Sequence, residues 1–222
     1  MTTQEPTITP PVAARGALAA WAGRAGRLLV LVSGLACFSL GIVLTLRSHV
    51  GLGPWDVFHQ GVSQRLGISF GTANLVVGFC ILLLAWTLGA RPGLGTVLNM
   101  LLVGAFVDGI SASGIVPDLA GQALPWRILM DLAGVAVVGI GTAFYIRANF
   151  GAGPRDGLML VVSRRVGGRV SVVRGAIELA ALGIGFLLGG TAGLGTLIFA
   201  LGIGPAVGLA FRLFGVQTER RH

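Results

Sequence analysis

Two glycine-rich stretches of the chain each place a proline and an aspartate together. GLGPWD covers residues 51–56, and GAGPRD covers residues 151–156, one hundred residues later. Proline is favoured in the first turn of a helix, so Asp56 and Asp156 are expected near the start of two helices. A carboxylate there could bind a cation or a polar solute, or it could only stabilise the positive end of the helix. Both interpretations stay open at this point.

Other polar residues share these helices or interrupt apolar sequence. Ser63 and Ser163 follow the two aspartates by seven residues, nearly two helical turns, so each shares a helix face with its aspartate. Glu178 lies inside an apolar run, one turn after Arg174, where a carboxylate usually faces a cavity or a partner. An ion pair and a proton relay are both compatible with it. We therefore predict a substrate or ion site built from Asp56, Ser63, Asp156, Ser163 and Glu178.

The glycines and prolines of the two stretches predict interruptions in the helices. Glycine permits backbone conformations that other residues resist, and irregular backbone at membrane depth persists only inside protein or along a wet cavity. Helices that break at corresponding places in two halves of a chain indicate the binding site of a transporter. The predicted backbone breaks comprise Gly51, Gly53, Pro54, Gly151, Gly153 and Pro154.

Composition indicates that the surrounding elements are membrane helices. Of 222 residues, 54% are hydrophobic and 11% are charged, 37 are glycine, and the mean hydropathy is +0.87. A membrane-spanning helix needs about 20 predominantly apolar residues. Runs without any charged residue cover residues 28–46, 70–90 and 179–211, and the last is long enough for two short spans. We therefore predict an all-α polytopic membrane protein.

Several function classes are disfavoured by the same sequence. The net charge is +8, but the basic residues, all of them arginine, flank apolar runs as in membrane proteins, so we expect no nucleic-acid partner. Cys37 and Cys80 fall inside apolar runs and are interpreted as packing residues. Motifs of catalysis, metal binding and dinucleotide binding are missing from the sequence. We expect no enzyme activity, no metal site and no cofactor.

An internal repeat relates the two halves of the chain. When residues 41–110 are compared with residues 141–210 at a fixed offset, 20 of 70 positions are identical. The identities include GLGT, at residues 93–96 and 193–196, which we expect to form tight turns with a threonine bonded to local backbone. Such self-similarity favours two homologous repeats of about 100 residues.

Each repeat divides into one long helix, one short helix and two further long helices. The short helix, about 13 residues or 20 Å, is shorter than the apolar core of about 30 Å, so we expect it to dip into the membrane or lie at its interface. Six spans with inverted repeats are favoured, and eight spans with parallel repeats are the alternative. We divide the chain into a disordered basic tail (1–27), two membrane repeats (28–127 and 128–215) and a C-terminal tail (216–222).

Arginine positions predict the orientation of the chain in the membrane. With six spans, 13 arginines fall on the side of the N-terminus and three on the other, namely Arg47, Arg65 and Arg127. Cytoplasmic loops carry the excess of arginine, so we predict a cytoplasmic N-terminus.

The stretch GLGPWDVFHQGVSQRLGISFGTANLVVG, followed by RPGLGTVLNMLLVG, resembles the bacterial YczE/YyaS/YitT group of integral membrane proteins, and its YczE branch in particular. The resemblance covers roughly residues 28–215, and the second motif, GAGPRDGLML, fits it more loosely. It implies a multi-pass protein of the bacterial plasma (inner) membrane and supplies no substrate.

These observations lead to one functional prediction and one alternative. We predict a small secondary transporter or permease for an unidentified small solute, coupled to a cation or a proton. The alternative is a non-transporting scaffold or regulator of a membrane-associated pathway. The lipid bilayer and a small solute are the expected partners, and assembly into a homo-oligomer is left open.

Overall fold

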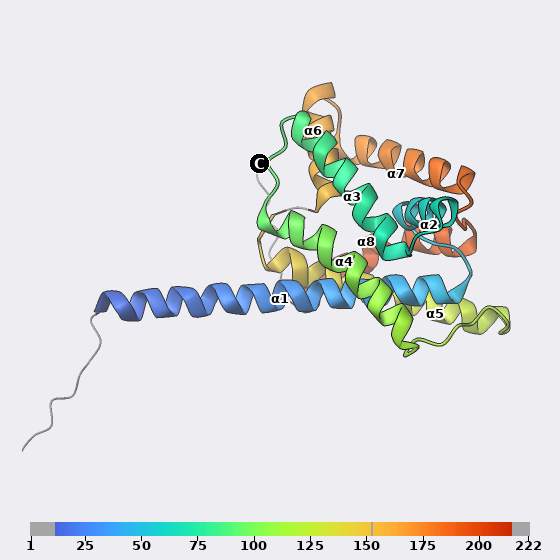
Figure 1. The fold of residues 1–222 in the computed structure, drawn as a ribbon, viewed down its shortest axis with the longest axis horizontal. Coiled ribbons are helices and arrows are strands. Elements are labelled where there is room, and N and C mark those ends of the chain that lie inside the picture. The colour runs from blue at the N-terminus through green and yellow to red at the C-terminus, as the bar shows by residue number, and fades with distance from the viewer. Residues whose placement is uncertain (1–11, 152, 215–222) are drawn as a thin grey trace, which may run out of the picture.

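The computed structural model describes residues 12–151 and 153–214, and these residues fold into eight helices (Figure 1). The expected all-helical class is confirmed. The helices are α1 (Val12–Ser48), α2 (Pro54–Leu66), α3 (Phe70–Thr87), α4 (Leu94–Ser113), α5 (Leu124–Arg147), α6 (Pro154–Val166), α7 (Val170–Leu187) and α8 (Leu194–Leu213).

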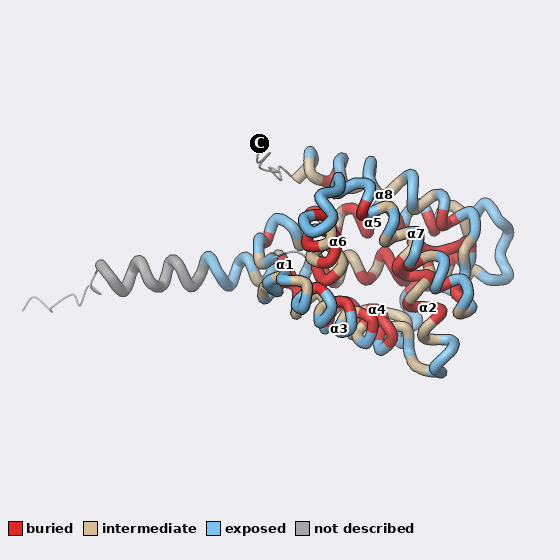
Figure 2. Tube along the Cα trace, turned by 90° about the horizontal axis from the view of Figure 1, so that it is seen from above, coloured by how far each residue is buried: buried red, intermediate tan, exposed pale blue. Residues whose placement is uncertain are grey.

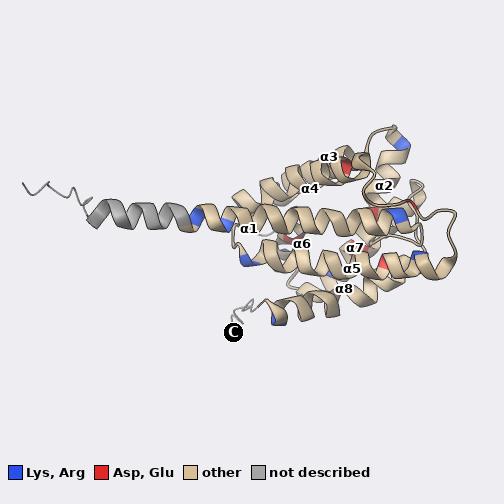
Figure 3. Cartoon of the chain, turned by 90° about the horizontal axis from the view of Figure 1, so that it is seen from below, with Lys and Arg blue, Asp and Glu red and all other residues tan. Residues whose placement is uncertain are grey.

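Six helices in the described part of the chain are long and apolar enough to cross a membrane. They are α1, from Gly23 onward, and α3, α4, α5, α7 and α8. Their outward faces are exposed while their inward faces are buried (Figure 2), and the helices carry few charged residues along their length (Figure 3). The two remaining helices, α2 and α6, have 13 residues each and are too short to span alone.

The N-terminal boundary differs from the sequence prediction. Residues 12–27, which the sequence placed in a disordered tail, continue α1 as helix. The rest of that predicted tail, residues 1–11, and the C-terminal tail, residues 216–222, lie outside the described residues. Alanine and arginine, which both favour helix, dominate this stretch, and they extend the helix beyond the apolar run.

Glycines bring α1 and α5 into close, antiparallel contact. A Cβ atom on Gly34 would lie 2.6 Å from the backbone nitrogen of Tyr145, and one on Gly41 would lie 2.8 Å from the carbonyl oxygen of Gly134. Contacts nearer the start of α1 thus meet the late part of α5, and contacts nearer the end of α1 meet earlier residues of α5. Small residues of this kind allow membrane helices to approach closely.

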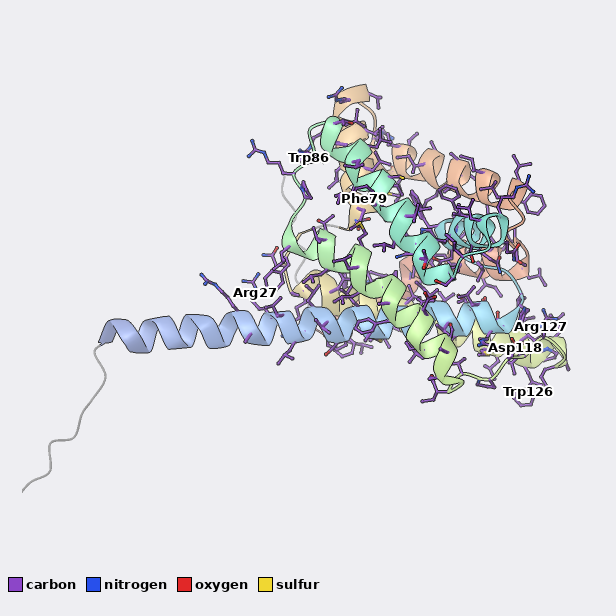
Figure 4. The ribbon with its side chains drawn as sticks, in the orientation of Figure 1. Arg27, Phe79, Trp86, Asp118, Trp126 and Arg127 are labelled. Carbon is purple, nitrogen blue, oxygen red and sulfur yellow. The ribbon has the colours of Figure 1, made fainter. Side chains whose placement is uncertain are left out.

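Two arginines fasten the ends of this helix pair. Arg27 Nε donates to the carbonyl oxygen of Ala148 at 3.0 Å, beyond the end of α5. Arg127 Nε donates to the carbonyl oxygen of Ser48 at 2.9 Å, at the end of α1. Figure 4 shows the two arginines at opposite ends of the bundle, which we call the Arg27 end and the Arg127 end. The exposed Trp86 and Trp126 lie toward these two ends, as interfacial tryptophans of membrane proteins do.

Neither short helix connects one end of the bundle to the other. At the Arg127 end, Arg47 Nη2 near the end of α1 donates to the carbonyl oxygen of Ser111 near the end of α4. The start of α3 meets the same part of α4, because the backbone N–H of Gly71 donates to Asp108. The end of α1 and the start of α3 therefore lie at the same end, and α2 returns to the side from which it starts.

Helix α6 also begins and ends on one side of the bundle, at the Arg27 end. Arg147, at the end of α5, donates to the carbonyl oxygen of Phe214, just after α8. Arg165, near the end of α6, donates to the carbonyl oxygen of Leu88, just after α3. These contacts leave α6 at the Arg27 end. The described fold therefore agrees with the favoured prediction of six spans and not with the alternative of eight.

A loop carboxylate joins α1 to the α4–α5 connection at the Arg127 end. Asp118 accepts from Arg47 Nη1 at 3.0 Å and lies 2.8 Å from His49 Nε2. The N–H of Ala120, with the Arg47 and His49 side chains, holds the pKa of the Asp118 carboxyl below its usual range. Figure 4 shows Asp118 beside Arg127 at this end.

This lowered pKa predicts a pH-dependent contribution to stability. A group whose pKa is lower in the folded state stabilises it above the unfolded pKa, about 4 for aspartate, and loses that contribution as pH falls further. We expect Asp118→Asn to melt at a lower temperature than the unmodified protein at pH 6, with the difference shrinking below about pH 4. Thermal unfolding in detergent across pH 3–7 measures this. A difference in Tm that is the same at every pH would contradict it.

Candidate functional site

The two interrupted segments are each held by the GLGT turn of the other half of the chain. Gly195 N donates to the carbonyl oxygen of Val50 at 3.1 Å, and Gly95 N donates to that of Phe150 at 2.8 Å. Gly51 and Gly151 adopt φ angles of 136° and 112°, which only glycine adopts readily. The repeated motifs thus position one another across the molecule.

The predicted threonine turns are present in both halves. The Thr96 hydroxyl accepts from the backbone N–H of Gly93, and the Thr196 hydroxyl accepts from that of Gly193, each at 3.1 Å. These bonds satisfy a donor at the start of α4 and α8 that would otherwise lack an intrahelical partner. They fix the turns that contact the interrupted segments.

The two interruptions converge on one cavity of about 600 Å³ inside the bundle. Gly53, Pro54 and Asp56 line it at the N-terminus of α2, and Gly153, Pro154 and Asp156 line it at the N-terminus of α6. Both short helices therefore direct their N-termini toward the same space. The other polar or charged lining residues are Trp55, Asn74, Asn99, Thr142, Tyr145, Arg155, Arg174 and Glu178.

Asp56 is the most deeply buried acidic residue of the cavity. Only 4% of it is exposed, and its Oδ1 lies 3.6 Å from His59 Nδ1 and 3.9 Å from Arg155 Nη2. These separations are too long for hydrogen bonds, and Oδ1 has no hydrogen-bond partner among the described residues. The nearby cationic and imidazole groups offset part of the cost of burying the carboxylate.

Arg155 joins the two halves of the site. Its guanidinium carbon lies 5.1 Å from the centre of the Trp55 ring, within the range of a cation–π interaction. Its Nη2 also lies 3.4 Å from the side-chain oxygen of Asn74, on α3. An arginine from α6 thus contacts α2 and α3, which belong to the other half of the chain.

The remaining two carboxylates differ in their partners. Glu178 accepts from Arg174 Nε at 2.9 Å, so the ion pair expected as one alternative for this residue is present. Asp156 accepts from the Tyr145 hydroxyl at 3.4 Å. No ion pair to Asp156 is found among the described residues.

The predicted serines are not part of the cavity lining. The Ser63 hydroxyl donates to the carbonyl oxygen of Ile68, and the Ser163 hydroxyl donates to that of Gly168, each at 2.6 Å. Both bonds close the turn after a short helix, where carbonyl groups lack intrahelical donors. Of the five predicted site residues, the structure therefore brings together Asp56, Asp156 and Glu178.

Several other residues that line the cavity were not predicted from the sequence. Arg155 follows Pro154 directly and stands where the first half of the chain has Trp55, so the internal repeat does not indicate it. Its signal was an arginine in the first turn of a short helix between two apolar spans. Tyr145, Asn74 and Asn99 carry no charge and share no motif, and only the fold brings them together.

The cavity extends toward the Arg27 end and is closed toward the Arg127 end. Tyr145 and Val207 line it, whereas the residues one hundred positions earlier, Thr45 and Val107, are 1% and 0% exposed. Side-chain exposure also supports an opening at the Arg27 end, because 54% of the Arg174 side chain is accessible but only 6% of the Asp56 side chain.

The closed side is sealed by contact between α3 and α4. A Cβ atom on Gly104 would lie 2.5 Å from the carbonyl oxygen of Gly71. Asp108 on α4 also accepts from the Ser69 hydroxyl and from Gly71 N, at the start of α3. At the corresponding place in the second half, a Cβ atom on Gly204 or Gly208 would meet nothing within 4 Å.

The described residues contain no cluster of three or more histidine, cysteine or acidic side chains able to hold a metal ion. The side chains that line the cavity combine carboxylates, guanidinium groups, amides and aromatic rings.

Residues 25–212 match a family described as "Family of unknown function (DUF6198)". An "Uncharacterized protein" of Haemophilus influenzae is 36% identical over 188 residues, which cover 84% of each chain. "Uncharacterized membrane protein YczE" of Bacillus subtilis is 33% identical over 171 residues, covering 76% of this chain and 78% of that one. "Uncharacterized protein YyaS" of the same organism is 24% identical over 169 residues, covering 74% and 82%.

No solved structure matches the chain. The relatives support the resemblance to the YczE and YyaS proteins and the membrane class, and their names state no activity. Because the match extends from before the first apolar run almost to the end of α8, it includes the interrupted segments and the cavity between them. The chain belongs to the DUF6198 family of membrane proteins related to YczE.

Proposed function

We propose that the protein is a small secondary permease that moves a small polar solute across the bacterial plasma membrane. The observation that carries this proposal is the convergence of the two interrupted segments on one polar cavity within an apolar bundle. Buried charged groups are costly in a membrane protein and usually serve a solute or ion path. A helix-packing role alone would not need five charged side chains around a cavity of about 600 Å³.

The arrangement of the halves supports an inverted repeat as part of this proposal. The bounds of α2, α3 and α4 recur one hundred residues later, to the residue, in α6, α7 and α8. Equivalent residues make reciprocal contacts: Arg27 bonds beyond the end of α5, and Arg127 bonds at the end of α1. Since α1 and α5 run antiparallel, the relation between the halves inverts their direction across the membrane, as in many secondary transporters.

The distribution of arginine supports an orientation with the Arg27 end in the cytoplasm. The loop and helix termini at the Arg127 end carry Arg47, Arg65 and Arg127, and the Arg27 end carries most of the others. By the positive-inside rule, the cavity then opens toward the cytoplasm.

Solute flux tests the proposal directly. Proteoliposomes are incubated with a ¹³C-labelled bacterial metabolite extract, and the trapped contents are identified by mass spectrometry. We expect at least one solute to accumulate above protein-free liposomes, and Asp156→Asn to reduce its initial rate about tenfold or more. The reason is that a hydrogen bond to a charged group contributes about 1.5–3 kcal/mol. Asp118→Asn, which removes a loop carboxylate outside the cavity, is the matched control and should transport normally.

Two results would count against transport. One is the absence of any solute that depends on the protein for entry, and the other is unchanged flux in both Asp156→Asn and Glu178→Gln. Recovery of a stable protein partner without solute flux would instead favour the alternative function, a membrane scaffold or regulator.

A further inference from the structure

The cavity contains one more acidic group than basic groups. Its lining includes three carboxylates, on Asp56, Asp156 and Glu178, and two guanidinium groups, on Arg155 and Arg174. Arg174 pairs with Glu178 at 2.9 Å, and Arg155 lies within 3.9 Å of Asp56. Asp156 has only the neutral Tyr145 hydroxyl within bonding distance among the described residues. A bound cation would neutralise this carboxylate.

Two buried polar atoms at the cavity lack partners in the described residues. They are the acceptor Oδ1 of Asp56, a residue 4% exposed, and the donor Nε1 of Trp55, a residue 8% exposed. A buried polar atom without a hydrogen bond costs about 1–3 kcal/mol, so native proteins rarely keep one without a reason. A donor and an acceptor on two successive lining residues suit a ligand that carries both a hydrogen-bond acceptor and a hydrogen-bond donor.

The size and walls of the cavity favour an organic ligand over a bare ion. About 600 Å³ far exceeds the space for one monovalent ion. Aromatic rings line it, among them Phe38, Phe199, Phe211, Trp55 and Tyr145. Aromatic faces attract organic cations through their negative electrostatic potential, and they also provide apolar contact.

We propose that this cavity binds a small organic amine of net positive charge that also carries a hydrogen-bond acceptor such as a hydroxyl group. The ammonium group lies between the carboxylates of Asp56 and Asp156, and the acceptor faces Trp55 Nε1. This inference rests on the proposed function, because it names the ligand class of the same cavity.

Four isosteric probes test the charge preference. Phenylglycinol carries an ammonium and a hydroxyl group, phenylglycine an ammonium and a carboxylate, phenylethanediol two hydroxyls, and mandelate a hydroxyl and a carboxylate. Binding to the purified full-length protein in detergent is measured by calorimetry at constant ionic strength. We expect phenylglycinol to bind most tightly, and replacement of its ammonium by hydroxyl to weaken binding about tenfold or more.

Variants assign the effect to the cavity. Asp156→Asn should remove most of the preference for phenylglycinol over phenylethanediol, while Asp118→Asn should retain it. Trp55→Phe keeps an aromatic ring without the N–H, so it should weaken phenylglycinol binding several-fold. Tm without ligand confirms that each variant is folded.

Three results would overturn the inference. They are equal binding of phenylglycinol and phenylethanediol, tighter binding of phenylglycine or mandelate than of phenylglycinol, and an unchanged preference in Asp156→Asn. The inference and the proposed function fail separately, since this assay measures binding without flux. Binding of phenylglycinol that depends on Asp156, with no flux of any solute, would leave the ligand class standing and remove the permease. Flux of an anionic solute with no phenylglycinol binding would support the permease and remove the proposed ligand class.

Discussion

Gly104→Ala is expected to destabilise the folded protein by about 1–3 kcal/mol, as overpacking of a close contact does. The added methyl group would lie 2.5 Å from the carbonyl oxygen and 3.1 Å from the carbonyl carbon of Gly71. Both atoms belong to backbone, so α3 and α4 must separate to admit it. Separation would also stretch the bonds from Ser69 and Gly71 to Asp108. Thermal unfolding of the purified protein in detergent measures the loss.

The corresponding residue in the other half supplies the matched control. A Cβ atom on Gly204 would meet nothing within 4 Å, and the residue lies within α8. Alanine has the higher helix propensity, but the ring of Pro205 disfavours a helical residue with a Cβ atom directly before it. These two effects oppose each other, so Gly204→Ala should change stability by less than about 1 kcal/mol, well below the loss in Gly104→Ala. Equal losses in the two variants would show that α3 and α4 are not held together as described. A Gly104→Ala protein as stable as the unmodified one would show the same.

This difference between two equivalent glycines lies beyond what sequence alone could predict. Hydropathy is a local property, so together with the shortness of the two remaining helices it predicted the six candidate spans. The helix bounds that recur at an offset of one hundred residues agree with the offset of the sequence motifs. The contacts between α3 and α4 depend on how far two helices approach. Residues 104 and 204 are both glycine in otherwise similar sequence, and nothing in either stretch indicates which one is in contact.

For the candidate site too, the sequence predicted the local features but not the contacts between distant residues. Proline and glycine marked the interrupted segments, and the aspartates beside them do line the cavity. Helical periodicity also placed Ser63 on the face of Asp56, but a serine near the end of a helix has local carbonyl acceptors, and one of these takes its hydroxyl. Arg155 reaches Asn74 on α3, a contact between the halves that only the folded arrangement reveals.

A cysteine at position 200 is expected to react with a membrane-impermeant thiol reagent far faster than a cysteine at position 100. Ala200 lines the cavity and is exposed, whereas Met100 is 7% exposed and would contact a Cβ atom on Gly78 at 3.0 Å. A buried cysteine at position 100 reacts only when the packing around it opens locally. An opening that costs about 1.4 kcal/mol slows the reaction tenfold, so we expect at least a tenfold difference in rate between the two positions. The measurement uses Cys37→Ala and Cys80→Ala as background, with reagent added to intact cells or to inverted vesicles.

The side of the membrane from which the reagent reaches each cysteine tests the transport cycle. If the Arg27 end is cytoplasmic, Ala200→Cys reacts in inverted vesicles and is protected in intact cells. A permease with inverted halves must also visit a state in which α3 and α4 separate and α7 and α8 close. In that state Met100→Cys becomes reactive from outside the cell, and Ala200→Cys becomes protected. Labelling of position 100 from outside during solute turnover would therefore tie the unequal packing of the halves to transport. Solute turnover with position 100 never labelled would mean that the α3–α4 seal does not open, and that the cavity alone does not describe the path.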